Sequence, residues 1–191
     1  MKKRCSLSLV VMAVGLFSAY GDIIPSFDSA FAFGNNSVWN YNIDVTGLTA
    51  VQTGDFFTIY DFGTFVPGSN SQPVGWALTA SPIGNTPGQV LPTDSPSLLN
   101  LTWTYDGPTI TGPALDLGVF RVTVLGPVSA LGTSQFASQS TRSDGPNAGT
   151  KLENIGAIPV PIAIPEPGIT VLIAIGGACF AGRSIFRRRR S

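Results

Sequence analysis

Alternating apolar and polar residues in the middle of the chain constrain its fold more than any other feature. In Leu99–Asp106 the apolar residues face one way and the polar residues the other, and Ser37–Val45 repeats this pattern. A period of two over about eight residues is typical of a half-buried β-strand. Phe56–Phe62 and Val119–Leu125 are apolar on both faces or nearly so, which indicates strands inside a sheet.

Three further segments complete the strands predicted within residues 22–163. Val74–Ala80 is one, whereas Gln135–Arg142 and Thr150–Ile158 are polar enough to be edge strands. Turn residues separate the strands, and Val66–Pro96 predicts long loops around a single strand. About seven short strands predict an all-β fold, a single antiparallel β-sandwich. Its predicted core is aromatic and contains Trp39, Tyr41, Phe57, Trp76, Trp103 and Phe120.

The central domain is acidic and lacks both histidine and cysteine. Residues 22–163 carry ten acidic and three basic side chains, although the whole chain has 11 of each. Nucleic-acid binding requires clustered Lys or Arg, so this composition argues against it. The chain has no histidine, and Cys5 and Cys179 lie in the terminal segments. Histidine- and cysteine-based catalysis and metal binding are therefore excluded from the domain, and we expect no cofactor.

The amino-terminal segment, residues 1–21, has the three parts of a secretory signal peptide. Met1–Arg4 is basic, Leu7–Phe17 is an apolar run, and Ala19 and Gly21 occupy the −3 and −1 positions of a cleavage site for signal peptidase. The alternative is an uncleaved anchor helix, but the apolar run is short against the ~20 residues that span a bilayer. The sequence therefore predicts export of everything after residue 21.

The carboxy-terminal segment, residues 164–191, combines a proline motif, an apolar stretch and arginines. Pro165, Glu166 and Pro167 come first, and Gly168–Gly182 would form a helix of about 22 Å. Continuing through Phe186 brings the helix to about 28 Å, close to the ~30 Å hydrocarbon core. Arginines at the end of the helix favour the cytoplasmic side, namely Arg183, Arg187, Arg188, Arg189 and Arg190. Physical chemistry alone thus predicts a single-pass, tail-anchored protein whose middle domain lies outside.

The order of these parts resembles the PEP-CTERM sorting signal of Gram-negative bacteria. The resemblance implies that Pro165–Pro167 is the motif recognised by exosortase, a membrane-embedded transpeptidase-like enzyme, and that the arginines are the cytoplasmic stop. It also implies that the protein is held transiently in the inner membrane and then delivered to the cell surface or the exopolysaccharide matrix. Cys179 is not part of the family pattern, and a small apolar packing role accounts for it.

Within the domain, a few residues are candidates for chemistry or binding. Asp55 and Asp61 could form a carboxylate pair for glycoside hydrolysis or calcium, but turn residues that bond local backbone fit them better. Trp39 and Trp103 lie on apolar faces and indicate core, whereas Trp76, beside the loops, is the candidate for an exposed sugar-binding residue. Arg121, on an otherwise apolar strand, is expected to reach the rim or to pair with an acid.

The sequence leaves three classes of function open. The first is a non-enzymatic structural or interaction protein of the cell surface, for which exosortase and signal peptidase are the processing partners. The second is a carbohydrate-binding module, since β-sandwich folds often host such modules, although the fold alone is only an analogy. The third is an extracellular hydrolase, which the absence of histidine and of any nucleophile motif makes the weakest.

Overall fold

The computed structural model describes residues 22–128 and 130–161, which form eight antiparallel β-strands and no helix. The strands are β1 (Ile23–Phe33), β2 (Asn36–Val51), β3 (Phe56–Ile59), β4 (Trp76–Ser81), β5 (Asn100–Tyr105), β6 (Ile110–Leu125), β7 (Leu131–Arg142) and β8 (Lys151–Pro161). The prediction of an all-β, antiparallel fold is confirmed.

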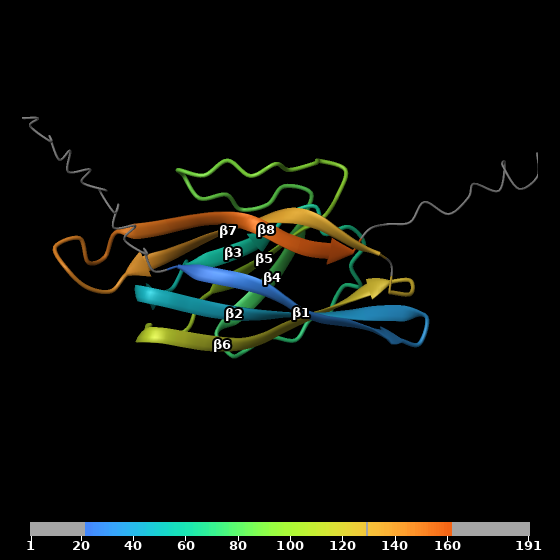
Figure 1. Ribbon diagram of the computed structural model, residues 1–191, viewed down its shortest axis with the longest axis horizontal. Helices are drawn as coiled ribbons and strands as arrows, with labels where there is room; N and C mark the ends of the chain where they lie inside the picture. Colours follow the sequence, from blue (N-terminus) through green and yellow to red (C-terminus); the bar gives the residue numbers. More distant parts are fainter. Residues whose placement is uncertain (1–21, 129, 162–191) are drawn as a thin grey trace, which may run out of the picture.

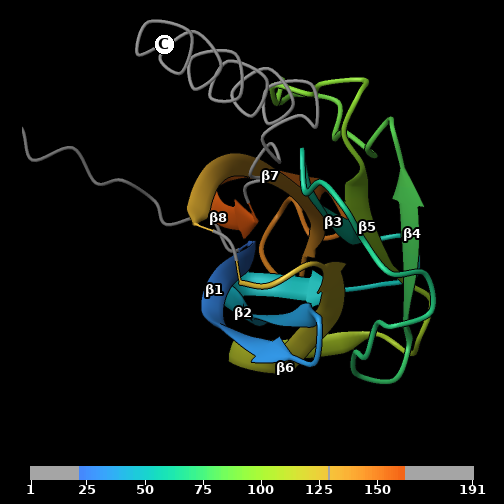
Figure 2. The same cartoon turned by 90° about the vertical axis from the view of Figure 1, so that its right-hand side faces the viewer.

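The strands form one hydrogen-bonded sheet that curls over on itself (Figures 1 and 2). Strands β1 and β6 flank β2, whereas β8, β7, β3, β5 and β4 follow one another in the other part of the sheet. The two parts are joined where Thr49 and Ala50 of β2 pair with Arg142 and Thr141 of β7. This curl brings the inner face of β1, β2 and β6 opposite the inner face of the remaining strands.

Aromatic side chains from both parts of the sheet fill the space between them. The ring of Phe120, on β6, lies 5.1 Å from that of Phe57, 5.3 Å from that of Trp76 and 5.9 Å from that of Trp103. All six aromatic residues predicted for the core are buried. Because each aromatic residue can bury ~150–250 Å², this cluster supplies the main stabilisation of a domain that has no disulfide.

The predicted positions of the strands hold better than their predicted surroundings. Val119–Leu125 was expected to be buried on both faces, but β6 pairs only with β2, and its outward side chains, Val119 and Leu125, are exposed. Gln135–Arg142 was expected at an edge, but β7 lies inside the sheet and buries Ser138 and Ser140. Polarity misled this prediction because a small hydroxyl side chain can be buried when it finds hydrogen-bond partners, as the hydroxyl of Ser138 does by donating to the carbonyl of Ile23 at 2.6 Å.

The first strand, β1, had no counterpart among the predicted strands. Its sequence contains Pro25 and a register shift between Phe27 and Ser29, which interrupts the alternation of apolar and polar residues. The proline fits because β1 pairs with β2 on one side only. The prediction of long loops around one strand is confirmed, since β4 is the only strand between β3 and β5.

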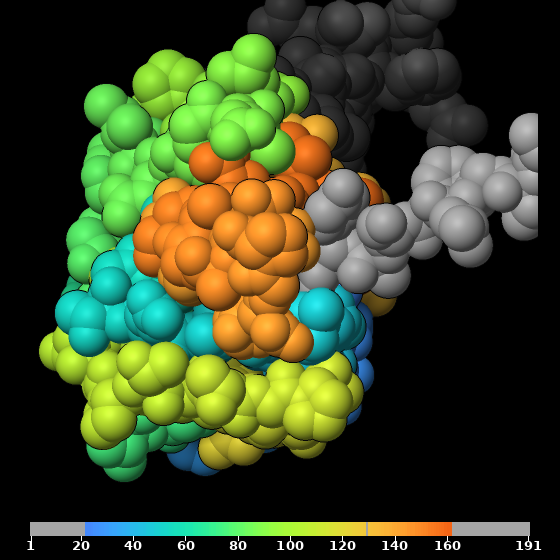
Figure 3. Space-filling model, turned by 90° about the vertical axis from the view of Figure 1, so that its left-hand side faces the viewer, coloured from blue at the N-terminus to red at the C-terminus, as the bar shows by residue number. Residues whose placement is uncertain are grey.

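The fold is elongated, and its two ends differ in what they carry. We call the end at which β8 finishes, at Pro161, the exit end. The same end carries the turn between β1 and β2 and the connection from β6 to β7 (Figures 1 and 2). The turn between β7 and β8 and the start of β1 lie at the opposite end, which Figure 3 shows face on.

Candidate functional site

Asp55 lies in the turn before β3, and its carboxylate is fully buried. It accepts hydrogen bonds from the backbone N–H of Gln52 at 2.8 Å and from the hydroxyl of Thr141 at 2.9 Å. Its Oδ1 lies 2.5 Å from Nζ of Lys151, on β8. The turn-bonding role predicted for Asp55 is confirmed, and the ion pair additionally ties this turn to β7 and β8.

Asp61 lies beyond the other end of β3 and has an unusual backbone. Its φ is 50°, a value that few residues other than glycine adopt, and its N–H donates to Oδ1 of Asn100 at 2.8 Å. Its carboxylate accepts a hydrogen bond from the N–H of Ser95 at 2.8 Å, so it holds a distant loop and not local backbone. The four residues of β3 span about 13 Å, which is more than any glycosidase carboxylate pair requires. Asp55 and Asp61 therefore do not form a catalytic pair.

The described part of the chain contains no preformed site for calcium or another metal ion. Among these residues no group of three or more Asp, Glu, His or Cys side chains could hold a metal ion.

Trp76 lies in the core, which confirms its place among the predicted core aromatics and shows that the alternative of an exposed sugar-binding ring is wrong. The residue is 6% exposed, and its ring centroid lies 5.1 Å from that of Tyr105 and 5.3 Å from that of Phe120. The inward direction is set by β4, on which Trp76 pairs with Tyr105 of β5. Since Trp39 and Trp103 are also buried, none of the three tryptophans offers a surface for stacking on a sugar.

Arg121 lies on the outer face of the β1–β2–β6 part of the sheet, the face turned away from the core. Its Nε donates to Oδ1 of Asn40 at 2.8 Å, and the amide of Asn40 in turn donates to the hydroxyl of Ser29 at 3.0 Å. The arginine is thus exposed, as predicted for a residue at the rim, and the partner found for its Nε is an amide, not an acid. Its role in the fold is to link three neighbouring strands.

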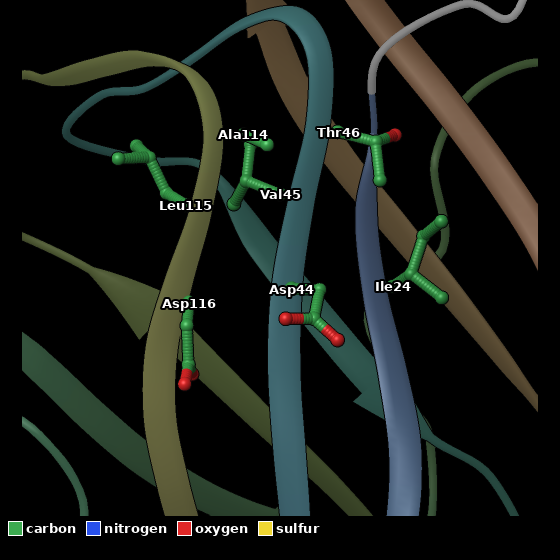
Figure 4. A pocket seen from close by; sticks show the side chains of 7 residues that line it. All are labelled: Ile24, Asp44, Val45, Thr46, Ala114, Leu115 and Asp116. Carbon is green, nitrogen blue, oxygen red and sulfur yellow. The ribbon is translucent and has the colours of Figure 1, made fainter.

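An open hollow on the same part of the sheet holds two carboxylates (Figure 4). Asp44 and Asp116 are directly opposite in the register of β2 and β6, and Ile24, Ala114 and Leu115 supply apolar lining. The carboxylate of Asp116 accepts a hydrogen bond from the N–H of Gly118 at 2.7 Å. The sequence contained no signal for this pair, because 72 positions separate the two residues and only strand register brings them together.

Asp22 is a further residue that the sequence did not single out. Its side chain is buried beside β7, and Oδ1 accepts hydrogen bonds from the N–H of Ile23 at 3.0 Å and from the hydroxyl of Ser138 at 3.3 Å. Burial raises the pKa of this carboxyl group from 3.8 to about 7, because desolvation disfavours the charged form more than these hydrogen bonds favour it.

The remaining predicted site residues lie outside the described residues. These are Ala19, Gly21, Pro165, Glu166, Pro167, Arg183, Arg187, Arg188, Arg189 and Arg190. Within residues 22–128 and 130–161 there is no helix of a length and hydropathy suited to crossing a membrane. No protein-family profile matches the chain, and no curated protein is significantly similar to it.

Proposed function

We propose that this chain is an exported, non-enzymatic protein of the cell surface or exopolysaccharide matrix, sorted and processed by exosortase through a PEP-CTERM signal in residues 164–191. In this proposal signal peptidase removes residues 1–21, the tail holds the protein in the inner membrane, and exosortase then acts near Pro165–Pro167. The domain between these two segments would be a two-layer β-sandwich, formed by the curl of the sheet.

One observation carries the proposal: a complete aromatic core lies between the two terminal segments. Among the described residues, the buried cluster extends from Ile23 to Val160, so residues 22–161 supply an apolar core of their own. A domain with a core of its own is what a protein needs if its terminal segments are removed during processing. The described residues also support a non-enzymatic role, because the carboxylates of Asp55 and Asp61 bond to backbone and do not converge on a site.

Mass spectrometry of the carboxy terminus tests the proposal. In cells with a working exosortase we expect mature protein that lacks Arg187–Arg190, and in cells without the enzyme we expect those residues to be retained. Recovery of Arg190 in the mature protein from exosortase-positive cells would refute sorting and leave a plain tail-anchored protein.

The chain offers a matched pair of substitutions for the same assay. It contains two glutamates, Glu166 in the proline motif and Glu153 on β8. We expect Glu166→Gln to block removal of the tail, whereas Glu153→Gln should leave processing unchanged. Equal processing of the two variants would show that the motif is not read.

Carbohydrate binding is a second candidate, favoured by the hollow between β2 and β6. Its carboxylates, Asp44 and Asp116, can accept hydrogen bonds from sugar hydroxyls, while Ala114 and Ile24 offer apolar contact to a sugar ring. A glycan array probed with residues 22–163 tests this candidate, with Asp44→Ala as the variant expected to lose binding. Uniform silence of the array would remove it.

A further inference from the structure

Five of the exposed large apolar side chains lie at one end of the fold. They are Phe31 (44% exposed), Phe33 (68%), Leu125 (58%), Val128 (40%) and Leu131 (55%). Phe33 and Leu125 flank Asn36 on the outer face, since Asn36 pairs with both residues. Leu131 begins β7 and pairs with Pro161. All five side chains thus belong to the exit end, which Figure 2 shows face on, and we call them the exit patch.

The chain segments that form the exit patch carry no charge. No charged residue occurs between Asp28 and Asp44, between Arg121 and Arg142, or between Glu153 and Glu166. Two carboxylates, Asp61 and Asp94, also belong to this end, in the loops that follow β3 and β4. Both carboxylates already accept a hydrogen bond from the protein. Asp61 accepts one from the N–H of Ser95 at 2.8 Å, and Asp94 accepts one from the side-chain amide of Asn100 at 2.8 Å.

The position at which the chain leaves the fold indicates what covers the exit patch. The described fold ends at Pro161, beside Leu131, and only six residues separate it from Gly168, where the apolar tail segment begins. Six extended residues reach about 20 Å. A domain tethered to a bilayer by that segment would therefore be held with its exit end close to the lipid headgroups.

We propose that the exit patch docks on the lipid surface of the membrane that holds the tail, so that the domain stands on the bilayer with β1, β6 and β7 pointing toward it. This inference rests on the proposed tail anchor. Exposed phenylalanine, leucine and valine side chains partition into the headgroup and acyl boundary, and the absence of charged residues from the segments that form the exit patch avoids the desolvation of ions there. Docking would keep Pro165–Pro167 at the membrane surface until exosortase acts.

Two asparagines at opposite ends of the fold allow a matched test. Asn35 lies in the turn between β1 and β2 at the exit end, and Asn147 lies in the turn between β7 and β8; both residues are exposed. The 12 residues of β7 span about 40 Å, so a label at position 147 lies far from the bilayer if the exit end touches it. The test uses residues 22–191, the chain that remains after the predicted signal peptide is removed, with Cys179→Ala and with either Asn35→Cys or Asn147→Cys carrying an environment-sensitive fluorophore.

Each labelled chain is reconstituted in vesicles of phosphatidylethanolamine and phosphatidylglycerol, with and without brominated lipid. We expect the label at position 35 to show blue-shifted emission that brominated lipid quenches, and the label at position 147 to show neither effect. Adding Phe31→Ser and Phe33→Ser should abolish the blue shift and the quenching at position 35. Val74→Ser, which changes a side chain 99% exposed outside the exit patch, should leave both unchanged.

The possible failures are distinguishable by flotation of the same vesicles. Protein that does not float with the vesicles lacks the tail anchor, which refutes the anchor of the proposed function together with docking. Protein that floats but shows the same emission at both positions keeps its anchor and overturns docking alone. A blue shift at position 35 without quenching by brominated lipid would mean that protein, such as a second copy of this chain, covers the patch, and this outcome also overturns docking.

Discussion

Replacing Asp22 by asparagine tests how a buried carboxyl group controls the pH dependence of folding. Burial raises the pKa of this group from 3.8 to about 7 in the folded chain, whereas the unfolded chain keeps the ordinary value. Between these values the folded chain holds a proton that the unfolded chain has released, so the free energy of unfolding falls as the pH rises. Each pH unit is worth about 1.4 kcal/mol, and the gap of about 3 units gives a loss of about 4 kcal/mol.

The variant Asp22→Asn retains an oxygen that can accept the hydrogen bonds of Ile23 and Ser138, but it does not titrate. We therefore expect the difference in stability between the variant and the wild type to grow in favour of the variant from pH 4 to pH 7 and to level off above pH 7. Urea unfolding of residues 21–163, in which a residue before Asp22 keeps its nitrogen in a peptide bond, measures this difference. Asp106→Asn, at an exposed carboxylate, is the control. Parallel pH profiles for wild type and Asp22→Asn would refute the argument.

Three further substitutions test other parts of the structure. Lys151→Met leaves the buried carboxylate of Asp55 without its cation, and urea unfolding should show that the free energy of unfolding falls by about 2–3 kcal/mol. This is below the usual figure for a buried pair because the lysine side chain is 41% exposed. A fall of less than ~0.5 kcal/mol would contradict a stabilising ion pair. Trp76→Ala should destabilise the fold by ~3–5 kcal/mol in the same assay, whereas a surface-like change near zero would place the ring outside the core. Asp44→Asn relieves the repulsion between the carboxylates of Asp44 and Asp116 and should stabilise the fold by ~0.2–1 kcal/mol at low salt. If the added stability persisted in molar salt, it would not be electrostatic.

The strands that the sequence predicted well are those whose own residues carry the information. Leu99–Asp106 alternates regularly, and β5 (Asn100–Tyr105) follows it almost residue for residue. The predictions failed where neighbouring strands decide the environment. Val119 is exposed because its side chain points away from the core that the adjacent Phe120 enters, and Ser138 is buried because β7 lies between other strands. Neither fact is a property of the local sequence.

The candidate sites also differ in whether the local sequence or the pairing of distant strands determines them. The turn role of Asp55 follows from the Gly-Asp sequence before a strand, and it was predicted. Its ion pair with Lys151 spans 96 positions, and the facing carboxylates of Asp44 and Asp116 depend on strand register, so local sequence patterns could not reveal them. For Trp76 the sequence left both a core position and an exposed position beside the loops open, and the pairing of β4 with β5 turns the ring inward.

The amino-acid sequence by itself determined the strand-forming pattern, the aromatic content of the core and the expectation of two terminal targeting segments, because hydropathy and alternation are written in consecutive residues. Only the tertiary structure decided which strands lie at an edge, which carboxylates are buried, and that apolar side chains from β1, β6 and β7 meet at the end where the chain leaves the fold. These features depend on pairing between residues far apart in the chain, and the curl of the sheet creates that pairing.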